Sequence, residues 1–268
     1  MARENTVILH GQVLRKPEFY VKNGKLNRGS IIVKTLRRTN GTGGYAGSKL
    51  YFDCPIVLTR NEDMFRKLYV LEVGDMVDIK GALSTKEVLK SSLCPHCQAK
   101  NVTQGNTVFV TPIFIEKRES TLSVEDGLRT LKERSEISNL ITVIGTLCRD
   151  PGYYQDEKGR DYAQYQLAVN RRLRIREDNP DIKTDYPWVK TFGQQALNDS
   201  RALRQGSVVY ITGAVQTRDI ARTSVCVSCG KSYNWEERVT EIVPYSTEYL
   251  SGCVIPEEAS NAEEVEIE

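Results

Sequence analysis

Two short cysteine motifs carry the most specific chemistry in this sequence. Cys94-Pro-His-Cys97 and Cys226-Val-Ser-Cys229 begin 132 residues apart. A CxxC turn directs two thiolates toward one point, whereas a structural zinc ion takes four ligands in a tetrahedron. Neither pair completes such a site alone. We therefore expect Cys94, Cys97, Cys226 and Cys229 to hold a single Zn²⁺ between them, with the small residue Gly230 following the last thiolate as in many zinc knuckles.

Two other interpretations of the cysteines stay open. Each pair could belong to a separate metal site, completed by Cys54, Cys148, Cys253 or His96. A thioredoxin-like redox function is the other, but it requires a βαβ context. We expect cysteines outside a metal site to be small packing residues. We expect His10 to be an ordinary strand residue.

A second segment combines aromatic rings with a cation. In Tyr186-Pro-Trp-Val-Lys-Thr-Phe192, strand alternation places Tyr186, Trp188, Lys190 and Phe192 on one face. Rings stack on bases and cations pair with phosphates, which is the chemistry that captures a single nucleic-acid strand. Aromatic residues are often core residues, but Lys190 on the same face favours an outward orientation. The corresponding segment of the first half, Tyr51 to Val57, keeps Tyr51 but has Asp53, Pro55 and Val57 in place of the other three residues, so we expect weaker binding there.

Basic clusters precede both segments. A charge run is usually a solvated face, but proximity to the aromatic strand favours phosphate contact. The candidate phosphate-binding residues are Arg171, Arg172 and Arg174 in the second half and Lys34, Arg37 and Arg38 in the first. Tyr20 and Tyr154 occupy equivalent positions and are further candidates for base stacking.

An internal repeat relates these features. Asn5 to Gly11 aligns with Asn139 to Gly145, and the segments beginning at Gly74 and Gly81 align with those beginning at Gly206 and Gly213. The CxxC pairs follow in the same order. Matches kept in order over several segments indicate that one unit was duplicated.

The apolar residues of each half occur in short runs rich in Val, Ile and Tyr, separated by turn residues such as Asn23-Gly24. This pattern predicts about five β-strands per half and an all-β fold class. Between the halves, the segment from Ser123 to Arg134 begins with a capping serine and has helical apolar spacing, which predicts a linking helix.

Length and composition agree with a folded protein. The chain has 268 residues, 40% hydrophobic and 27% charged, and at roughly 150 residues per domain this indicates two domains. The net charge is +2, and it becomes +8 without the six acidic residues of segment 257–268, which favours an anionic partner. The sequence shows neither an apolar run that could cross a membrane nor the pattern of a signal peptide, so we expect a cytoplasmic protein.

The second half resembles the bacterial-type single-stranded DNA-binding protein family. The segments that carry the resemblance are 139–151, 166–171, 192–196, 205–213, 216–218 and 240–243. It implies two tandem five-stranded OB-fold barrels joined by a short helical linker, with the CxxC pairs in the hairpins between the fourth and fifth strands, as zinc-knuckle insertions that plain family members lack. The expected domains are 1–118 (first barrel), 119–137 (linker), 138–252 (second barrel) and 253–268 (acidic tail).

The resemblance implies a protein that coats single-stranded DNA during replication, recombination, repair or transfer, with an acidic tail that recruits partner proteins. This chain ends in Glu-Ile-Glu rather than in the family's proline and aromatic residue. The alternative is an OB-fold assembly module that binds another replication protein through its hairpins and tail. No catalytic constellation stands out, so we do not expect an enzyme. Family members usually assemble as oligomers; tandem barrels resemble a joined dimer, and pairing of two chains stays open.

Overall fold

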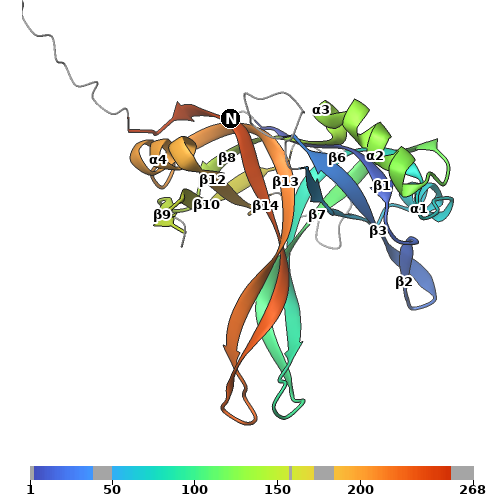
Figure 1. Ribbon diagram of the computed structural model, residues 1–268, viewed down its shortest axis with the longest axis horizontal. Coiled ribbons are helices and arrows are strands. Elements are labelled where there is room, and N and C mark those ends of the chain that lie inside the picture. The colour runs from blue at the N-terminus through green and yellow to red at the C-terminus, as the bar shows by residue number, and fades with distance from the viewer. Residues whose placement is uncertain (1–2, 39–49, 157–158, 172–183, 255–268) are drawn as a thin grey trace, which may run out of the picture.

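The structure is a computed structural model that describes residues 3–38, 50–156, 159–171 and 184–254. Two strand-rich halves lie side by side (Figure 1), and the described residues include four helices. The first half contains β1 (Asn5–Val13), β2 (Glu18–Lys22), β3 (Lys25–Arg37), β4 (Tyr51–Asp53), β5 (Ile56–Thr59), α1 (Glu62–Tyr69), β6 (Met76–Leu93) and β7 (Lys100–Glu119). The helices α2 (Val124–Glu133) and α3 (Ser135–Ser138) follow. The second half contains β8 (Asn139–Leu147), β9 (Gly152–Gln155), β10 (Asp161–Asn170), β11 (Thr184–Asp185), β12 (Trp188–Phe192), α4 (Gly193–Ala202), β13 (Val208–Val225) and β14 (Ser232–Ser251).

Each half closes its strands around an apolar core. In β8 and β10 buried residues alternate with more exposed ones, as expected for strands with one face toward the interior. The parallel pairs that close the two barrels are Val57 with Val110 and Val189 with Ile242. The two pairs lie 132 residues apart in sequence, so the fold repeats with the sequence.

The two halves join through their first strands. β1 and β8 pair in antiparallel fashion, with Val7 opposite Ile141 and Asn5 opposite Val143. One sheet therefore runs through both halves, in the order β14-β13-β8-β1-β6-β7 at its centre.

Repeated residues explain part of this architecture. Asn5 exchanges side-chain hydrogen bonds of 2.9 and 2.8 Å with the backbone of Leu83, and Asn139 does the same with Val215 at 2.9 Å. Gly81 lies at a strand irregularity where an added Cβ would come within 2.3 Å of a backbone oxygen, and Gly213 within 2.4 Å. Both positions therefore require glycine because the backbones approach too closely for a side chain.

Two long hairpins extend away from the barrels. β6 with β7 and β13 with β14 continue as paired ribbons, cross each other and end with their tips side by side (Figure 1). Ser92 and Tyr233 connect the hairpins by a hydroxyl contact of 2.7 Å, and Lys90 forms an ion pair with Glu237.

The predicted linking helix is present. Ser123 is its N-cap, and the Ser123 hydroxyl accepts the Asp126 N–H at 3.1 Å. Leu131 is buried with Leu36 and Met76, so α2 packs against the first barrel. Within the described ranges, no helix is both long and apolar enough to span a membrane.

Candidate nucleic-acid interface and metal centre

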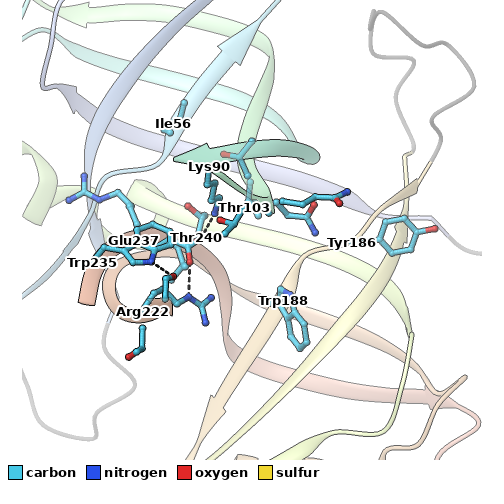
Figure 2. Close-up of a pocket in the computed structure, with 18 of the residues that line it drawn as sticks. Ile56, Lys90, Thr103, Tyr186, Trp188, Arg222, Trp235, Glu237 and Thr240 are labelled. Carbon is cyan, nitrogen blue, oxygen red and sulfur yellow. Dashed lines mark hydrogen bonds and ion pairs between the residues drawn. The ribbon is translucent and has the colours of Figure 1, made fainter. Parts of the chain in front are cut away.

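The aromatic segment forms β12 and the two residues before it, and its side chains alternate as the sequence predicted. Val189 and Thr191 are buried, whereas Trp188 and Lys190 are half-buried on the other face. Tyr186 is 47% exposed and Phe192 is 50% exposed, so neither ring belongs to the core. Figure 2 shows Tyr186 and Trp188 along the same edge of the second barrel.

The neighbouring strands extend this surface. Register places Tyr162 opposite Phe192, and Tyr154 opposite Tyr162. The rings of Tyr154 and Tyr162 stack with centroids 5.2 Å apart. We call Tyr154, Tyr162, Trp188, Lys190 and Phe192 the outer platform.

Cations lie directly on these rings. Lys190 Nζ is 4.2 Å from the ring centre of Tyr162 and 5.5 Å from that of Phe192. Arg149, in the turn after β8, lies 4.6 Å above the ring of Trp188. Burial, followed by repulsion from Arg218, lowers the pKa of Lys190. Arg149 and Tyr162 were not among the predicted site residues, although Arg149-Asp-Pro151 repeats Arg15-Lys-Pro17 in the first half.

The basic cluster of the second half is not a simple row of surface cations. Arg171 is only 9% exposed, and its guanidinium donates to both oxygens of Asp185 at 2.5 and 2.8 Å. Asp185 therefore neutralises the charge of Arg171 inside the protein. Arg171 is not a phosphate contact, contrary to the prediction. Arg172 and Arg174 lie outside the described residues.

The structure also corrects the correspondence between the two aromatic segments. Asp53 accepts the N–H of Thr217 at 2.9 Å, and Asp185 accepts the N–H of Thr85 at 2.6 Å, which makes the two aspartates equivalent. Cys54 and Ile56 therefore occupy the positions of Tyr186 and Trp188, and Tyr51 is not the counterpart of Tyr186. The prediction was wrong in register because it aligned tyrosines rather than the buried aspartates.

The first-half candidates Tyr20, Tyr51 and Lys34 each take part in a contact between a cation and an aromatic ring. Tyr20 is 52% exposed with Arg28 above its ring, and Tyr51 is 42% exposed with Arg37 above its ring. Lys34 Nζ lies 4.3 Å from the ring centre of Phe52.

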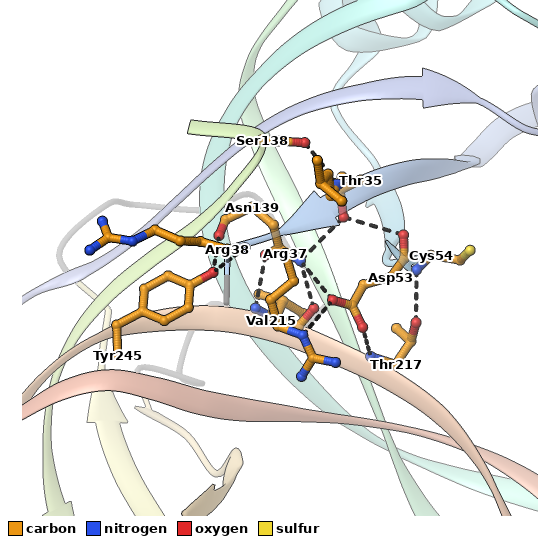
Figure 3. Close-up of polar contacts among 11 residues, drawn as sticks. Thr35, Arg37, Arg38, Asp53, Cys54, Ser138, Asn139, Val215, Thr217 and Tyr245 are labelled. Atoms are coloured by element: carbon orange, nitrogen blue, oxygen red, sulfur yellow. Dashed lines mark hydrogen bonds and ion pairs between the residues drawn. The ribbon is translucent and has the colours of Figure 1, made fainter. Parts of the chain in front are cut away.

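Arg37 and Arg38 are tied to the junction of the halves. Arg37 lies 3.3 Å from the Asp53 carboxylate, and Arg38 donates to Glu136 at 2.7 Å. The Arg38 N–H donates to the Tyr245 hydroxyl at 3.0 Å (Figure 3). Burial raises the pKa of Asp53, although Arg37 and the N–H of Thr217 oppose this rise.

The four predicted cysteine ligands meet at the hairpin tips. Their sulfur atoms all lie within 4.8 Å of one another. Cys94 and Cys229 approach to 3.8 Å and Cys97 and Cys226 to 3.6 Å, so each contact joins the two hairpins. Four thiolates at about 2.3 Å from a tetrahedral zinc ion would lie about 3.8 Å apart. The donor set and its spacing therefore fit one shared metal ion.

The backbone of each tip supports this geometry. The Gln98 N–H donates to the Cys94 carbonyl and the Gly230 N–H to the Cys226 carbonyl, both at 2.9 Å. Gln98 and Gly230 have positive φ angles of 58° and 71°, so both turns follow one path. Backbone N–H groups of Cys229 and Ser228 directed at the Cys226 sulfur lower the pKa of this thiol to about 6. A backbone N–H also favours the Cys97 thiolate, but the contacts with Cys226 and the other sulfurs outweigh it and raise the pKa of Cys97 to about 12, so Cys226 is the first of this pair to lose its proton.

The second half of the chain is similar in sequence to known proteins. Residues 138–228 match the single-strand binding protein family. A single-stranded DNA-binding protein of Staphylococcus epidermidis is 34% identical over 80 residues, which are 30% of this chain and 59% of that protein. Single-stranded DNA-binding protein 1 of Clostridium acetobutylicum is 29% identical over 113 residues, covering 42% of this chain and 93% of the relative. The chain thus spans less than two thirds of the Staphylococcus relative.

Solved structures extend the likeness to the whole fold. The wild-type single-stranded DNA-binding protein of Thermus aquaticus superposes with a TM-score of 0.59 at 19% identity, covering 98% of this chain and all of that one. A deletion mutant of the same protein gives a TM-score of 0.58 at 18% identity. At this identity the likeness is one of fold, and it confirms the expected OB-fold architecture over both halves.

Proposed function

We propose that this chain, which resembles bacterial single-stranded DNA-binding proteins in sequence over its second half and in fold over nearly its whole length, binds single-stranded DNA without catalysis. The observation that carries the proposal is the outer platform of the second barrel. There, rings from three adjacent strands lie on one outer face, together with Lys190 and with Arg149 above Trp188. The names of the Staphylococcus and Clostridium relatives support the same function.

The platform suits unpaired bases of any sequence. Stacking contributes about 1 to 3 kcal/mol per base and requires only the flat face that every base has. In a duplex these faces are covered by neighbouring bases, so the platform favours single strands. Lys190 and Arg149 stand beside the rings, where they would neutralise phosphates.

Titration with poly-dT tests this function. Binding should quench tryptophan fluorescence, because Trp188 would stack on bases. The affinity should fall with salt, by about 0.7 log units per log unit of salt for each phosphate neutralised. Unchanged fluorescence together with no retention of labelled poly-dT would contradict the proposal.

The two barrels should contribute unequally. Cys54, Ile56 and Leu58 of the first half replace Tyr186, Trp188 and Lys190, so these positions have a thiol and two aliphatic side chains in place of two rings and a cation. We propose that the second barrel makes most of the base contacts that determine the affinity. Tyr20, Tyr51 and Lys34 of the first barrel would make weaker contacts.

We further propose that the four-cysteine cluster holds one structural Zn²⁺. When bound, the ion would link the two hairpin tips through Cys94 and Cys97 on one side and Cys226 and Cys229 on the other. Asn101 supports the cluster from the first hairpin, because its amide accepts the Val227 N–H at 2.9 Å and donates to the Cys226 sulfur at 3.6 Å.

A protein of this kind would coat and protect DNA during replication, recombination, repair or transfer. The acidic tail within 253–268 remains a predicted contact for partner proteins, most of it outside the described residues, and pairing of two chains remains a prediction. The alternative of an assembly module is less well supported, because the relatives are named for DNA binding and the outer platform has the groups that this requires.

A further inference from the structure

A groove lies where the two long hairpins cross, next to the outer platform. Its walls come from β6 and β7 of the first half, from β13 and β14 of the second, and from the segments before and within β5 and β12. The lining includes Tyr186, Trp188, Trp235, Arg222, Arg238 and Asn106. Figure 2 shows the two tryptophans on different walls, Trp188 on the barrel and Trp235 on the hairpin.

The groove touches both barrels. Tyr186 and Trp188 line it on the second barrel, and their counterparts Cys54 and Ile56 line it on the first. It therefore lies between the two equivalent outer faces, in the position where a polymer bound to one face would continue toward the other.

Its charge suits a polyanion. Lys90, Arg222 and Arg238 are the cations of the lining, and Glu237 is its one acid among the described residues. The Glu237 carboxylate accepts from Lys90 and, at 2.7 Å, from Arg222. Arg238 is held by Asp219 at 2.9 and 3.0 Å but remains 53% exposed. The lining therefore carries a surplus of positive charge.

Trp235 gives the groove a second aromatic wall. Its indole N–H donates to the Ser224 hydroxyl at 2.9 Å, which fixes the ring across the hairpin. The same ring packs against the buried cluster of Cys94, Cys226 and Tyr233. A half-buried ring held in this way is a preorganised surface for stacking.

We propose that this groove is a second nucleic-acid subsite, in which one single DNA strand passes beneath the crossed hairpins with a base against Trp235 and phosphates beside Arg222 and Arg238. The inference rests on the proposed function and adds a site formed by both halves. The cysteine cluster would then have a second role besides joining the hairpin tips, because it supports the Trp235 ring that contacts the base.

Single-tryptophan variants test the subsite directly, since the chain has two tryptophans. Trp188→Phe leaves Trp235 as the reporter, and Trp235→Phe leaves Trp188. With dT of about 30 nucleotides, long enough to exceed one OB-fold site, the fluorescence of both variants should be quenched. Binding itself is followed independently by the anisotropy of a labelled oligonucleotide. If Trp188→Phe binds the oligonucleotide and Trp235 fluorescence does not change, the subsite does not exist.

A charge substitution provides a matched test without changing a ring. Asn106→Glu adds a negative charge to the groove lining, whereas Ser91→Glu adds the same charge to an exposed position of the same hairpin outside it. We expect Asn106→Glu to weaken dT binding on the order of tenfold at low salt and Ser91→Glu to change it less than twofold. Equal effects would overturn the inference.

The platform variant Phe192→Ala separates this inference from the proposed function. If Phe192→Ala weakens binding and Asn106→Glu does not, the function stands and the groove is empty of DNA. If the wild-type chain fails to bind dT at all, both fall.

Discussion

One pair of equivalent positions shows how the two barrels differ. Trp188 and Ile56 follow equivalent buried aspartates by three residues, but one carries a ring beneath Arg149 and the other an aliphatic chain. The backbone positions are alike. The difference in binding should therefore come from the side chains.

We expect Trp188→Ala to weaken binding of dT by about 1 to 3 kcal/mol, the value of one stacked base, and Ile56→Ala to change it by less than about 0.5 kcal/mol. Equilibrium titration with a labelled oligonucleotide measures both. Circular dichroism of each variant shows whether the fold is kept. Similar losses for the two variants would mean that the barrels bind equally.

The sequence alone predicted side-chain orientation correctly where one residue resolved an ambiguity. Lys190 cannot share a core face, so its position showed that Trp188 and Phe192 face outward. It failed for Arg171, because a buried ion pair with Asp185 cannot be distinguished from a solvated arginine without the fold. It also missed Arg149, which reaches the platform from a turn far away in sequence.

The position of the two long hairpins depends on the contacts that join their tips. The sequence predicted that the four cysteines meet, because each pair supplies only half of a tetrahedral site. The crossing of the hairpins below the tips, and the groove that it forms, could not be predicted from the sequence, because they depend on the twist of paired strands.

Metal analysis should find one zinc ion per chain. Cys226→Ser should remove the ion and open the tips, because the remaining thiolates cannot complete the tetrahedron. Faster amide exchange and proteolysis within segments 90–103 and 222–235 would show this, while the barrels remain folded. Cys148→Ser, a half-buried cysteine outside the cluster, is the control. Two ions per chain, or none, would exclude the shared site.

The turn before β6 is fixed by another buried charge. The Asp75 carboxylate, which has no exposed surface, accepts N–H groups of Glu72 and Thr121 at 2.7 Å and the Lys117 ammonium at 2.8 Å. Burial alone would raise the pKa of Asp75, but these donors outweigh burial and lower the pKa below its ordinary value of 3.8. The equivalent residue of the second half, Ser207, accepts the Arg204 N–H with a neutral hydroxyl.

A lowered carboxyl pKa stabilises the fold above the pKa of the unfolded chain, and this contribution is lost as the pH falls through the folded value. Asp75→Asn should therefore reduce the free energy of unfolding by about 1 to 3 kcal/mol at pH 7. The difference from wild type should shrink below pH 3.8. Urea unfolding at several pH values measures it. Glu133→Gln, at an exposed position, should cause no such pH-dependent difference.

At the scale of the whole molecule, the repeat in the sequence predicted two similar barrels, and the fold repeats as expected. The sequence did not show how the barrels join, because the joining residues are polar, and polar residues in a sequence usually indicate an exposed surface. Asp53 and Asp185 are nearly inaccessible, and each receives the N–H of a threonine from the opposite half. These reciprocal contacts, with the pairing of β1 and β8, make the two halves one folded unit.

The two buried aspartates that join the halves differ in how closely each one contacts its arginine. The Arg171 side chain alone is 5% exposed and makes two short bonds to Asp185, whereas the Arg37 side chain is 12% exposed and lies 3.3 Å from Asp53. Removing one partner of a buried ion pair leaves an uncompensated charge, which costs about 3 to 5 kcal/mol. Asp185→Asn should lower the free energy of unfolding by this amount. An amide offers one acceptor oxygen, whereas the Arg171 guanidinium donates to two.

Asp53→Asn should cost less. Burial raises the pKa of Asp53, so the charged form is already disfavoured in the fold, and an amide oxygen can still accept the Thr217 N–H. Denaturant unfolding followed by fluorescence and by circular dichroism measures both variants. Because each contact joins the halves, the two signals should shift together in a single transition. If Asp185→Asn unfolded in two separate steps, the halves would be independent domains rather than one cooperative structure.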